Sequence, residues 1–294
     1  MEEKVLESYR KAGGIAKEVR EWSRSLVKAD ASILEIAERI EAKIRETADV
    51  AFPTNICIND VTAHYTPKFD DKTTLSKKDV VSVDLGVHVD GYIADTAYTV
   101  DLSGNYSKLL DANRKALQES IELVKPGESV NTIGGAVQRI ITGAGFKPIE
   151  NLTGHEVRQY DLHAGLHIPN IRVPYDWKIE EDMVLALEPF ATDGYGRVVE
   201  SKYAEIYSLM GMKPTRLKEA RILMNEVEPR EGLPFAARWY SKKINPLRFN
   251  LALKEMVSKG ILREYPTLHE KEKGIVSQFE HTVLVTSDGC EVLT

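Results

Sequence analysis

The chain has 294 residues, of which 43% are hydrophobic and 29% are charged, and its formal net charge is -6. This composition is typical of a folded globular protein, and it excludes collagen-like, low-complexity and disordered classes. The acidic balance argues against a surface built as a whole for nucleic acid. At this length we expect one large domain, or one domain with a small added module.

The cysteines indicate the redox compartment of the chain, and its apolar runs indicate whether it contacts a membrane. Cys57 and Cys290 are too few for a disulfide framework, so we expect a reducing, cytoplasmic environment. The first residues lack the apolar core of a secretory signal, and no stretch approaches the roughly 18 apolar residues that a membrane-spanning helix needs. The sequence therefore predicts no membrane role.

Helices and strands alternate in groups along the chain. The first 46 residues predict two helices, and in the second Ser32 and Glu35 have the spacing of a capping box. Further helices are predicted over 107–124 and 130–141, and strands over 80–100, 183–190 and 275–286, followed by a last short strand. This order predicts an α+β fold, with an antiparallel sheet and helices on one face.

Residues 201–274 differ from the rest in charge. They carry a net charge of +6, whereas the remainder of the chain carries -12. Helical patterns at 214–226 and 247–259, followed by a β-like segment, predict a small helical, winged-helix-like subdomain inserted into a catalytic domain of residues 1–200 and 275–294. Such asymmetry is typical of a solvated accessory subdomain, and the alternative is a basic docking surface for RNA.

Apolar and polar residues alternate with period two through the segment VVSVDLGVHVDGYIADTAYTV, which predicts a half-buried hairpin. Asp90-Gly91 is a strong signal for its two-residue turn. With this turn Asp84 pairs with Ala97, so Asp95 lies diagonally across from Asp84 on the same face, roughly 7 to 8 Å away at the backbone. The two carboxylates either face water or converge on shared cations, and a one-residue slip would separate them.

Other carboxylates and imidazoles occur in apolar surroundings. Glu188 follows the run LAL, Glu280 lies inside VSQFEHTVLV, and GHEVRQYDLHAGLHIP supplies His155, His163 and His167. Any one histidine taken alone is more often a packed or solvated residue. Buried charges, however, are costly unless they are paired or coordinate metals. Four carboxylates with an imidazole suit a two-metal site for hydrolysis by a metal-bound hydroxide, with two divalent ions of Mn, Fe, Co or Zn.

Five segments occur in an order that identifies a family: FPTNICINDVTAHYTP, VDLGVHVDGYIADTAYTV, LTGHEVRQYDLHAGLHIPN, LALEPFAT and SQFEHTVLV. In these segments the chain resembles the type II methionine aminopeptidases, which have the pita-bread fold. The resemblance implies five metal ligands, namely Asp84, Asp95, His155, Glu188 and Glu280. It further implies that Asp84 binds one metal, that His155 and Glu188 bind the other, and that Asp95 and Glu280 bridge both.

The resemblance also implies roles for residues near the metals. Glu188 would be the proton shuttle, while His163 and His64 would contact the substrate, with His163 stabilising the developing oxyanion. Phe52 and Leu162 would line the pocket for the methionine side chain. The alternatives are a turn position for His64 and ordinary core positions for Phe52 and Leu162.

The implied function is removal of the N-terminal methionine from nascent proteins, with a metal-bridged hydroxide attacking the first peptide bond and a preference for a small second residue. The chain lacks the long N-terminal extension of eukaryotic members and resembles the short archaeal form. We expect a monomer whose partners are N-termini of nascent polypeptides and, through Lys242, Lys243, Arg248 and Lys254 of the basic insert, the ribosome. Two alternatives are a Xaa-Pro dipeptidase on the same fold and a non-catalytic ribosome- or RNA-binding relative, whose expected ligand substitutions are absent here.

Overall fold

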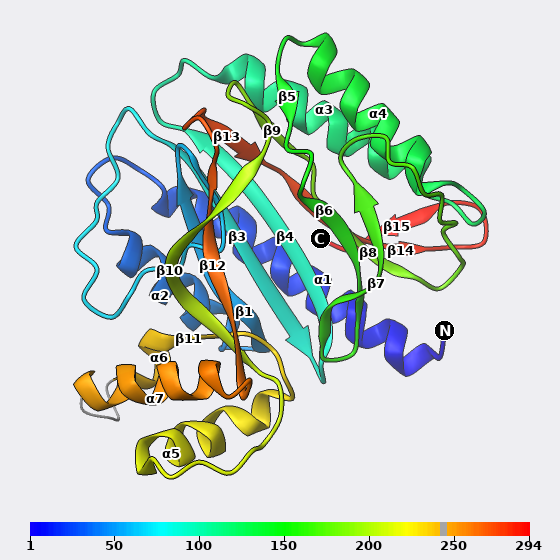
Figure 1. Ribbon diagram of the computed structural model, residues 1–294. Helices are drawn as coiled ribbons and strands as arrows, with labels where there is room; N and C mark the ends of the chain where they lie inside the picture. Colours follow the sequence, from blue (N-terminus) through cyan, green and yellow to red (C-terminus); the bar gives the residue numbers. More distant parts are fainter. Residues whose placement is uncertain (242–245) are drawn as a thin grey trace.

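A strongly curved antiparallel sheet forms the centre of the protein, in a computed structural model that describes residues 1–241 and 246–294. Its strand order is β1-β3-β4-β14-β8-β6-β7, and β15 pairs with β14. Helices α1 and α2 pack against β1, β3 and β4, behind the sheet in Figure 1, while β10 and β12 cross in front of it. Among the described helices, none is both long and apolar enough to cross a bilayer.

The helices lie close to where the sequence predicts them. They are α1 (Glu3–Ser23), α2 (Ile33–Ile44), α3 (Ser107–Leu123), α4 (Val130–Gly143), α5 (Lys218–Val227), α6 (Ala237–Ser241) and α7 (Pro246–Ser258), with short 3-10 turns at Arg24–Leu26 and Glu228–Arg230. The Ser32 side chain accepts a hydrogen bond from the backbone N–H of Glu35, so half of the predicted capping box forms. The predicted α+β fold with an antiparallel sheet is confirmed.

The strands within the described residues form three sheets. The main sheet contains β1 (Asp49–Ile58), β3 (Val80–Val89), β4 (Tyr92–Asp101), β6 (Thr153–Arg158), β7 (Asp161–Pro169), β8 (Val184–Leu187), β14 (Glu280–Val285) and β15 (Cys290–Val292). A four-stranded sheet contains β2 (Val61–Ala63), β10 (Val198–Leu209), β11 (Phe235–Ala236) and β12 (Leu262–Glu270). A small sheet contains β5 (Lys147–Pro148), β9 (Phe190–Thr192) and β13 (Val276–Gln278).

The hairpin of β3 and β4 has the predicted register. Asp90 and Gly91 have φ angles of 52° and 84°, and a tight hairpin turn that follows the strand twist needs such positive values. Asp84 consequently pairs with Ala97, and Gly86 pairs with Asp95. The two aspartates therefore lie on one face of the sheet, as the alternation predicts.

The segment between β9 and β13 contains both helices and strands. The helical patterns at 214–226 and 247–259 correspond to α5 and α7, which pack with α6 around a hydrophobic cluster of their own. Strands β10 and β12 flank these helices and pair with each other along most of their length. Both long strands extend from the helical lobe to the front of the main sheet (Figure 1).

A buried ion pair joins this helical lobe to the main body. The Arg238 guanidinium of α6 pairs with the Glu41 carboxylate of α2, and both side chains are 2% exposed. The same carboxylate accepts hydrogen bonds from the Trp239 indole at 2.7 Å and from the Thr54 backbone N–H of β1 at 3.2 Å. Arg238 also donates to Thr66 Oγ1 at 2.5 Å. The network therefore links α2, β1, α6 and the loop that follows β2.

Candidate metal centre

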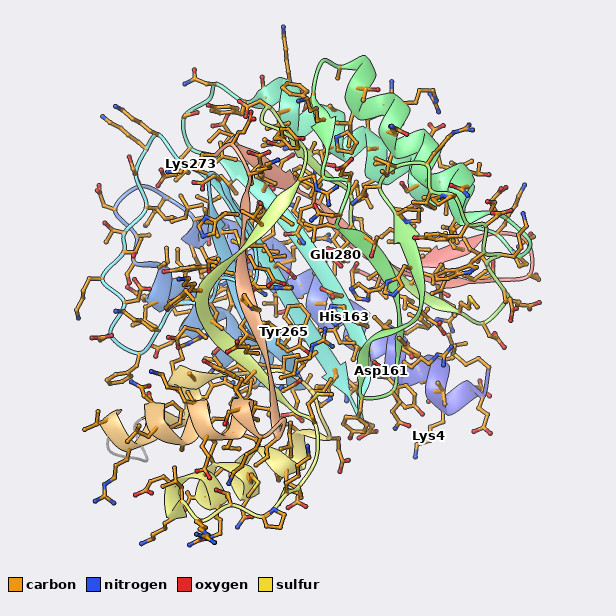
Figure 2. All side chains as sticks on the ribbon, viewed as in Figure 1. Lys4, Asp161, His163, Tyr265, Lys273 and Glu280 are labelled. Atoms are coloured by element: carbon orange, nitrogen blue, oxygen red, sulfur yellow. The ribbon has the colours of Figure 1, made fainter. Side chains whose placement is uncertain are left out.

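A cavity of about 220 Å³ lies between the main sheet and the strands that cross it. Every site residue predicted from the sequence lines this cavity, namely Phe52, His64, Asp84, Asp95, His155, Leu162, His163, Glu188 and Glu280. Figure 2 shows His163, Tyr265 and Glu280 near the centre of the molecule, whereas Lys4 and Lys273 lie toward its edge. The fold thus gathers polar groups from distant parts of the chain into one cavity.

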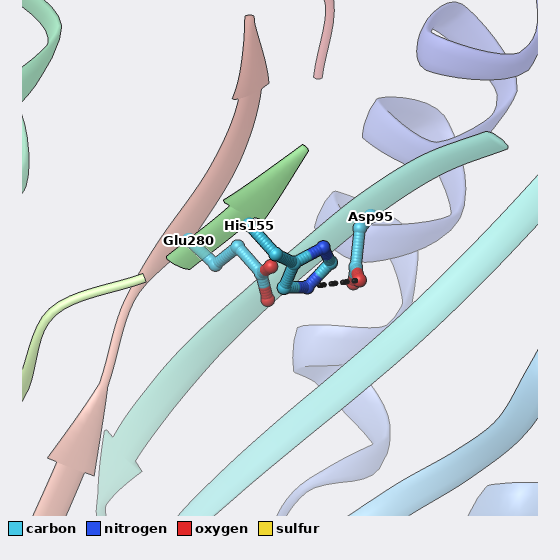
Figure 3. A group of neighbouring side chains, drawn as sticks. All are labelled: Asp95, His155 and Glu280. Carbon is cyan, nitrogen blue, oxygen red and sulfur yellow. Dashed lines mark ion pairs between the residues drawn. The ribbon is translucent and has the colours of Figure 1, made fainter. Parts of the chain in front are cut away.

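The metal-ligand candidates converge at the centre of the sheet. Ligand atoms of Asp95, His155 and Glu280 all lie within 4.8 Å of one another, and Figure 3 shows the imidazole between the two carboxylates. His155 Nε2 is 3.8 Å from Asp95 Oδ2 and 3.5 Å from Glu188 Oε1. Asp84 projects into the same cavity. The sheet register produces this convergence, because Glu280 pairs with Ala97, two residues from Asp95.

The chemistry of these groups fits divalent cations. Asp84 Oδ1, Asp95 Oδ1 and Glu280 Oε1 are buried oxygens without a hydrogen-bond partner. Within residues 1–241 and 246–294, no lysine or arginine pairs with these three carboxylates or with that of Glu188. Buried carboxylates left in this state are costly, and cations would satisfy them. Oxygen ligands with one imidazole nitrogen suit Mn, Fe, Co or Zn.

The carboxylates also retain protons more strongly than ordinary acids. Burial raises the pKa of Asp84 to about 7. Burial, reinforced by repulsion from neighbouring carboxylates, raises the pKa values of Asp95, Glu188 and Glu280 well above their usual range. Burial lowers the pKa of His155 to about 4, so its imidazole is neutral near pH 7. Its Nδ1–H donates to the backbone carbonyl of Glu156 at 3.4 Å, which leaves the Nε2 lone pair free to bind a metal.

Two further histidines border the metal-ligand cluster. The His163 ring centroid is 4.6 Å from that of His155, and the His64 ring stands edge-on to Tyr265 at 5.8 Å. Burial lowers the pKa of His64 to about 4. Burial, together with the adjacent imidazoles of His155 and His64, lowers the pKa of His163 well below its usual range. Both rings are therefore neutral at pH 7, and each offers one N–H donor.

His64 occupies an unusual backbone conformation. Its φ angle is 61°, in the left-handed region that side-chain-bearing residues seldom adopt. Its buried Nδ1 has no hydrogen-bond partner within the described parts of the chain. Backbone strain of this kind persists where the surrounding structure imposes it, and it is common at functional sites.

The apolar end of the cavity is formed by Phe52 and Leu162. These side chains are 6% and 9% exposed, and they belong to one hydrophobic cluster with Ile93. The Phe52 ring packs directly against Gly86 of β3, where it fills the space that a Cβ on residue 86 would need. The closed, apolar end has the character of a pocket for one side chain.

Some cavity residues were missed by the sequence reasoning. Gln278 Nε2 lies 3.5 Å from Glu188 Oε2, and its position two residues before Glu280 was a usable signal for the same face. Tyr265 of β12 lines the cavity, with its ring 6.4 Å from that of His163. No pattern in the sequence placed Tyr265 there, because only a long-range crossing of strands brings it to the site.

Comparison with known proteins identifies the family. The sequence model of metallopeptidase family M24 matches residues 7–287. The chain belongs to metallopeptidase family M24. It is 42% identical to a methionine aminopeptidase of Methanocaldococcus jannaschii over 294 residues, a match that covers 99% of this chain and 98% of the relative.

Solved structures confirm the fold of this M24 chain. A methionine aminopeptidase from Thermotoga maritima has a TM-score of 0.73 at 20% identity, with 100% of this chain and 98% of that chain covered. A thermophilic Arx1 has a TM-score of 0.86 at 18% identity, with 100% and 91% covered. The predicted family, pita-bread fold and divalent-metal peptidase class are therefore confirmed.

Proposed function

We propose that this M24 metallopeptidase removes the N-terminal methionine from polypeptides. The observation that carries the proposal is one cavity that combines unpaired buried carboxylates with an apolar end closed by Phe52 and Leu162. A flexible thioether side chain suits such an apolar pocket. Because the pocket is closed, it accommodates a single side chain, which favours cleavage after the first residue of a chain.

Two divalent cations would be held by the five ligands already described. In this assignment Asp84 would hold one cation, His155 and Glu188 would hold the other, and Asp95 and Glu280 would serve both. Support comes from the 4.8 Å cluster of ligand atoms and from the orphaned oxygen atoms of three of the carboxylates. Bound cations would supply Lewis-acid polarisation of the carbonyl and an activated water at neutral pH.

Glu188 is the proposed proton carrier of the reaction. Its carboxylate accepts a proton from the attacking water and delivers it to the amine of the leaving chain. Burial and repulsion from Asp84 raise its pKa well above the usual range, so this carboxylate holds a proton more readily than an ordinary glutamate. The Gln278 amide orients the second oxygen of Glu188.

His163 and His64 are the proposed hydrogen-bond donors to the substrate. A neutral imidazole N–H aimed at the scissile carbonyl stabilises the negative charge that develops on its oxygen. His163 is the closer of the two to the ligand cluster, since its ring is 4.6 Å from that of His155. The lowered pKa values keep both rings neutral at working pH, so neither imidazole places a positive charge beside the cations.

A substrate panel tests this function. Purified protein is stripped of metal with a chelator, supplied with Mn, Fe, Co or Zn, and assayed on Met-Ala-Ser and on Xaa-Pro dipeptides. We expect metal-dependent release of methionine. Predominant Xaa-Pro turnover would instead indicate a proline dipeptidase, and absence of all turnover in metal-loaded protein would indicate a non-catalytic binding protein.

The proposed setting is the cytoplasm, where the monomeric enzyme meets the N-termini of nascent polypeptides. Both cysteines are free thiols, which fits a reducing compartment. Contact with the ribosome through the basic insert is supported by its net charge of +6. Two of the four basic residues predicted for this contact, Lys242 and Lys243, lie outside the described residues. The test is salt-sensitive cosedimentation with ribosomes, and binding unchanged after neutralisation of Lys242, Lys243, Arg248 and Lys254 would contradict it.

A further inference from the structure

Three aromatic side chains form an exposed surface beside the metal centre, which we name the aromatic ledge: His167 of β7, and Tyr175 and Trp177 of the loop after β7. The ring centroids of His167 and Trp177 are 6.3 Å apart, and those of Trp177 and Tyr175 are 4.8 Å apart. Trp177 is 42% exposed and Tyr175 is 37% exposed. The catalytic roles proposed above use none of these three side chains.

The ledge is continuous with the catalytic cavity. His167 pairs directly with His155 in the register of β6 and β7, so both imidazoles project from the same face of the sheet. Thr153 lines the cavity, and its Oγ1 lies 3.4 Å from His167 Nδ1. The ledge therefore begins one strand away from the predicted metal ligand His155. It extends outward over β7, the edge strand of the main sheet.

The position of the ledge fits the path of a bound polypeptide. The closed apolar end of the cavity lies at Leu162, near the start of β7, whereas His167 lies near the end of that strand. When the side chain of the first substrate residue occupies this closed end, the scissile bond lies at the carboxylates of the metal-ligand cluster. The rest of the chain then has to leave the cavity by its open side, where Asn151 is exposed. An extended chain advances about 3.3 Å per residue, so neighbouring rings of the ledge, 6.3 and 4.8 Å apart, are spaced like residues one to two positions apart in an emerging polypeptide.

We propose that the aromatic ledge is a substrate subsite that binds an aromatic side chain at the third, fourth or fifth residue of the polypeptide. The inference rests on the proposed aminopeptidase function and adds a preference beyond the first two residues. Trp177 supplies a large apolar face, and Tyr175 and His167 flank it, so that an incoming ring stacks against one of them. Offset or edge-on aromatic pairs contribute beyond their buried area, which corresponds to roughly a twofold to tenfold gain in affinity.

The test compares peptides of different length and composition. Met-Ala-Ser, Met-Ala-Ser-Ser-Ser and three pentapeptides with phenylalanine at position three, four or five are assayed with wild-type enzyme and with Trp177→Ala. Tyr195→Ala is the matched control, since Tyr195 is 40% exposed and packs near Lys147 and Lys271, away from the cavity lining. We expect wild type to favour at least one phenylalanine peptide by about twofold to tenfold in kcat/KM, through a lower KM.

Each result has a defined meaning. Loss of that preference in Trp177→Ala, with Met-Ala-Ser turnover unchanged, supports the subsite, and Trp177→Phe is expected to restore part of it. Equal use of the serine and phenylalanine pentapeptides by wild type overturns the subsite, as does a preference that survives in Trp177→Ala. If Trp177→Ala lowers the unfolding midpoint, Tyr175→Ala decides the question by the same assay. Failure of wild type on Met-Ala-Ser would instead refute the aminopeptidase function itself.

Discussion

The side-chain amide of Gln278 lies 3.5 Å from Glu188, with Nε2 directed at Oε2. This hydrogen bond fixes one oxygen of the carboxylate whose other oxygen is 3.5 Å from His155. The amide thus orients a group that is assigned both to the metal and to the proton transfer. Gln278, which lies two residues before the predicted ligand Glu280, therefore acts on the reaction by orienting a second predicted ligand, Glu188.

Replacement of Gln278 by alanine is expected to lower kcat about tenfold, because a hydrogen bond to a charged group contributes roughly 1.5 to 3 kcal/mol and part of that orientation is lost. KM for Met-Ala-Ser and metal content should change little. Steady-state kinetics with metal analysis of the purified variant separate these quantities. A raised KM with unchanged kcat would show that Gln278 serves substrate binding instead.

Replacement of Asp95 by asparagine is expected to lower turnover by more than about a hundredfold, since even groups that only support a metal ligand change activity tenfold to a hundredfold. The reason is loss of a carboxylate that we assign to both cations. Metal content per chain, measured by elemental analysis, should fall in parallel. Asp161→Asn is the control, because Asp161 is an exposed carboxylate on β7. Full metal-dependent turnover in the Asp95 variant would contradict the assignment.

Metal removal is expected to make the stability of the folded protein depend on pH. The carboxylates of the cluster have raised pKa values when folded, so the folded state holds more protons than the unfolded state. Their contribution to stability is therefore present at low pH, and it is lost as pH rises from their ordinary values near 4 through about 7 for Asp84.

In chelator, we accordingly expect a lower urea midpoint at pH 8 than at pH 5. Manganese added at pH 8 should restore the midpoint, because cations bind the folded state selectively and replace the protons. Equal urea midpoints at pH 5 and pH 8 without metal would show that burial of these carboxylates does not destabilise the folded protein.

Replacement of Glu41 by glutamine is expected to destabilise the protein by about 3 to 5 kcal/mol, since it leaves the Arg238 guanidinium buried without its charge partner. Glu35→Gln is the matched control on the same helix. Its ion pair with Arg39 spans 3.8 Å between side chains that are 69% and 52% exposed, so we expect a change of about 0.5 kcal/mol or less. Urea denaturation measures both variants, and similar losses would contradict a special role for the buried pair.

The hairpin that carries two metal ligands was predictable because its signals are local. Asp90 and Gly91 specify the turn, and period-two alternation then places Asp84 and Asp95 on one face without any distant contact. The predicted hairpin register is confirmed. The ligand set itself was complete only through the family resemblance, because nothing local links His155 or Glu280 to the hairpin.

The opposite wall of the cavity was not predictable in the same way. The sequence predicts a helical insert over residues 201–274, but the long strands β10 and β12 that flank its helices cross the front of the main sheet and bring Tyr265 to the cavity. Their pairing contains register shifts between Glu200 and Ile206, which weaken any simple alternation. The division into domains at 200 and 275 stays a prediction.

The strand that contributes Glu280 is the penultimate strand of the chain, yet β14 occupies the middle of the main sheet between β4 and β8. Until translation has produced this strand, the two halves of the sheet lack the element that joins them. A prematurely terminated product that ends before β14 would be inert however well its N-terminal part folds. Enzymatic competence is thus acquired only in the last moments of synthesis.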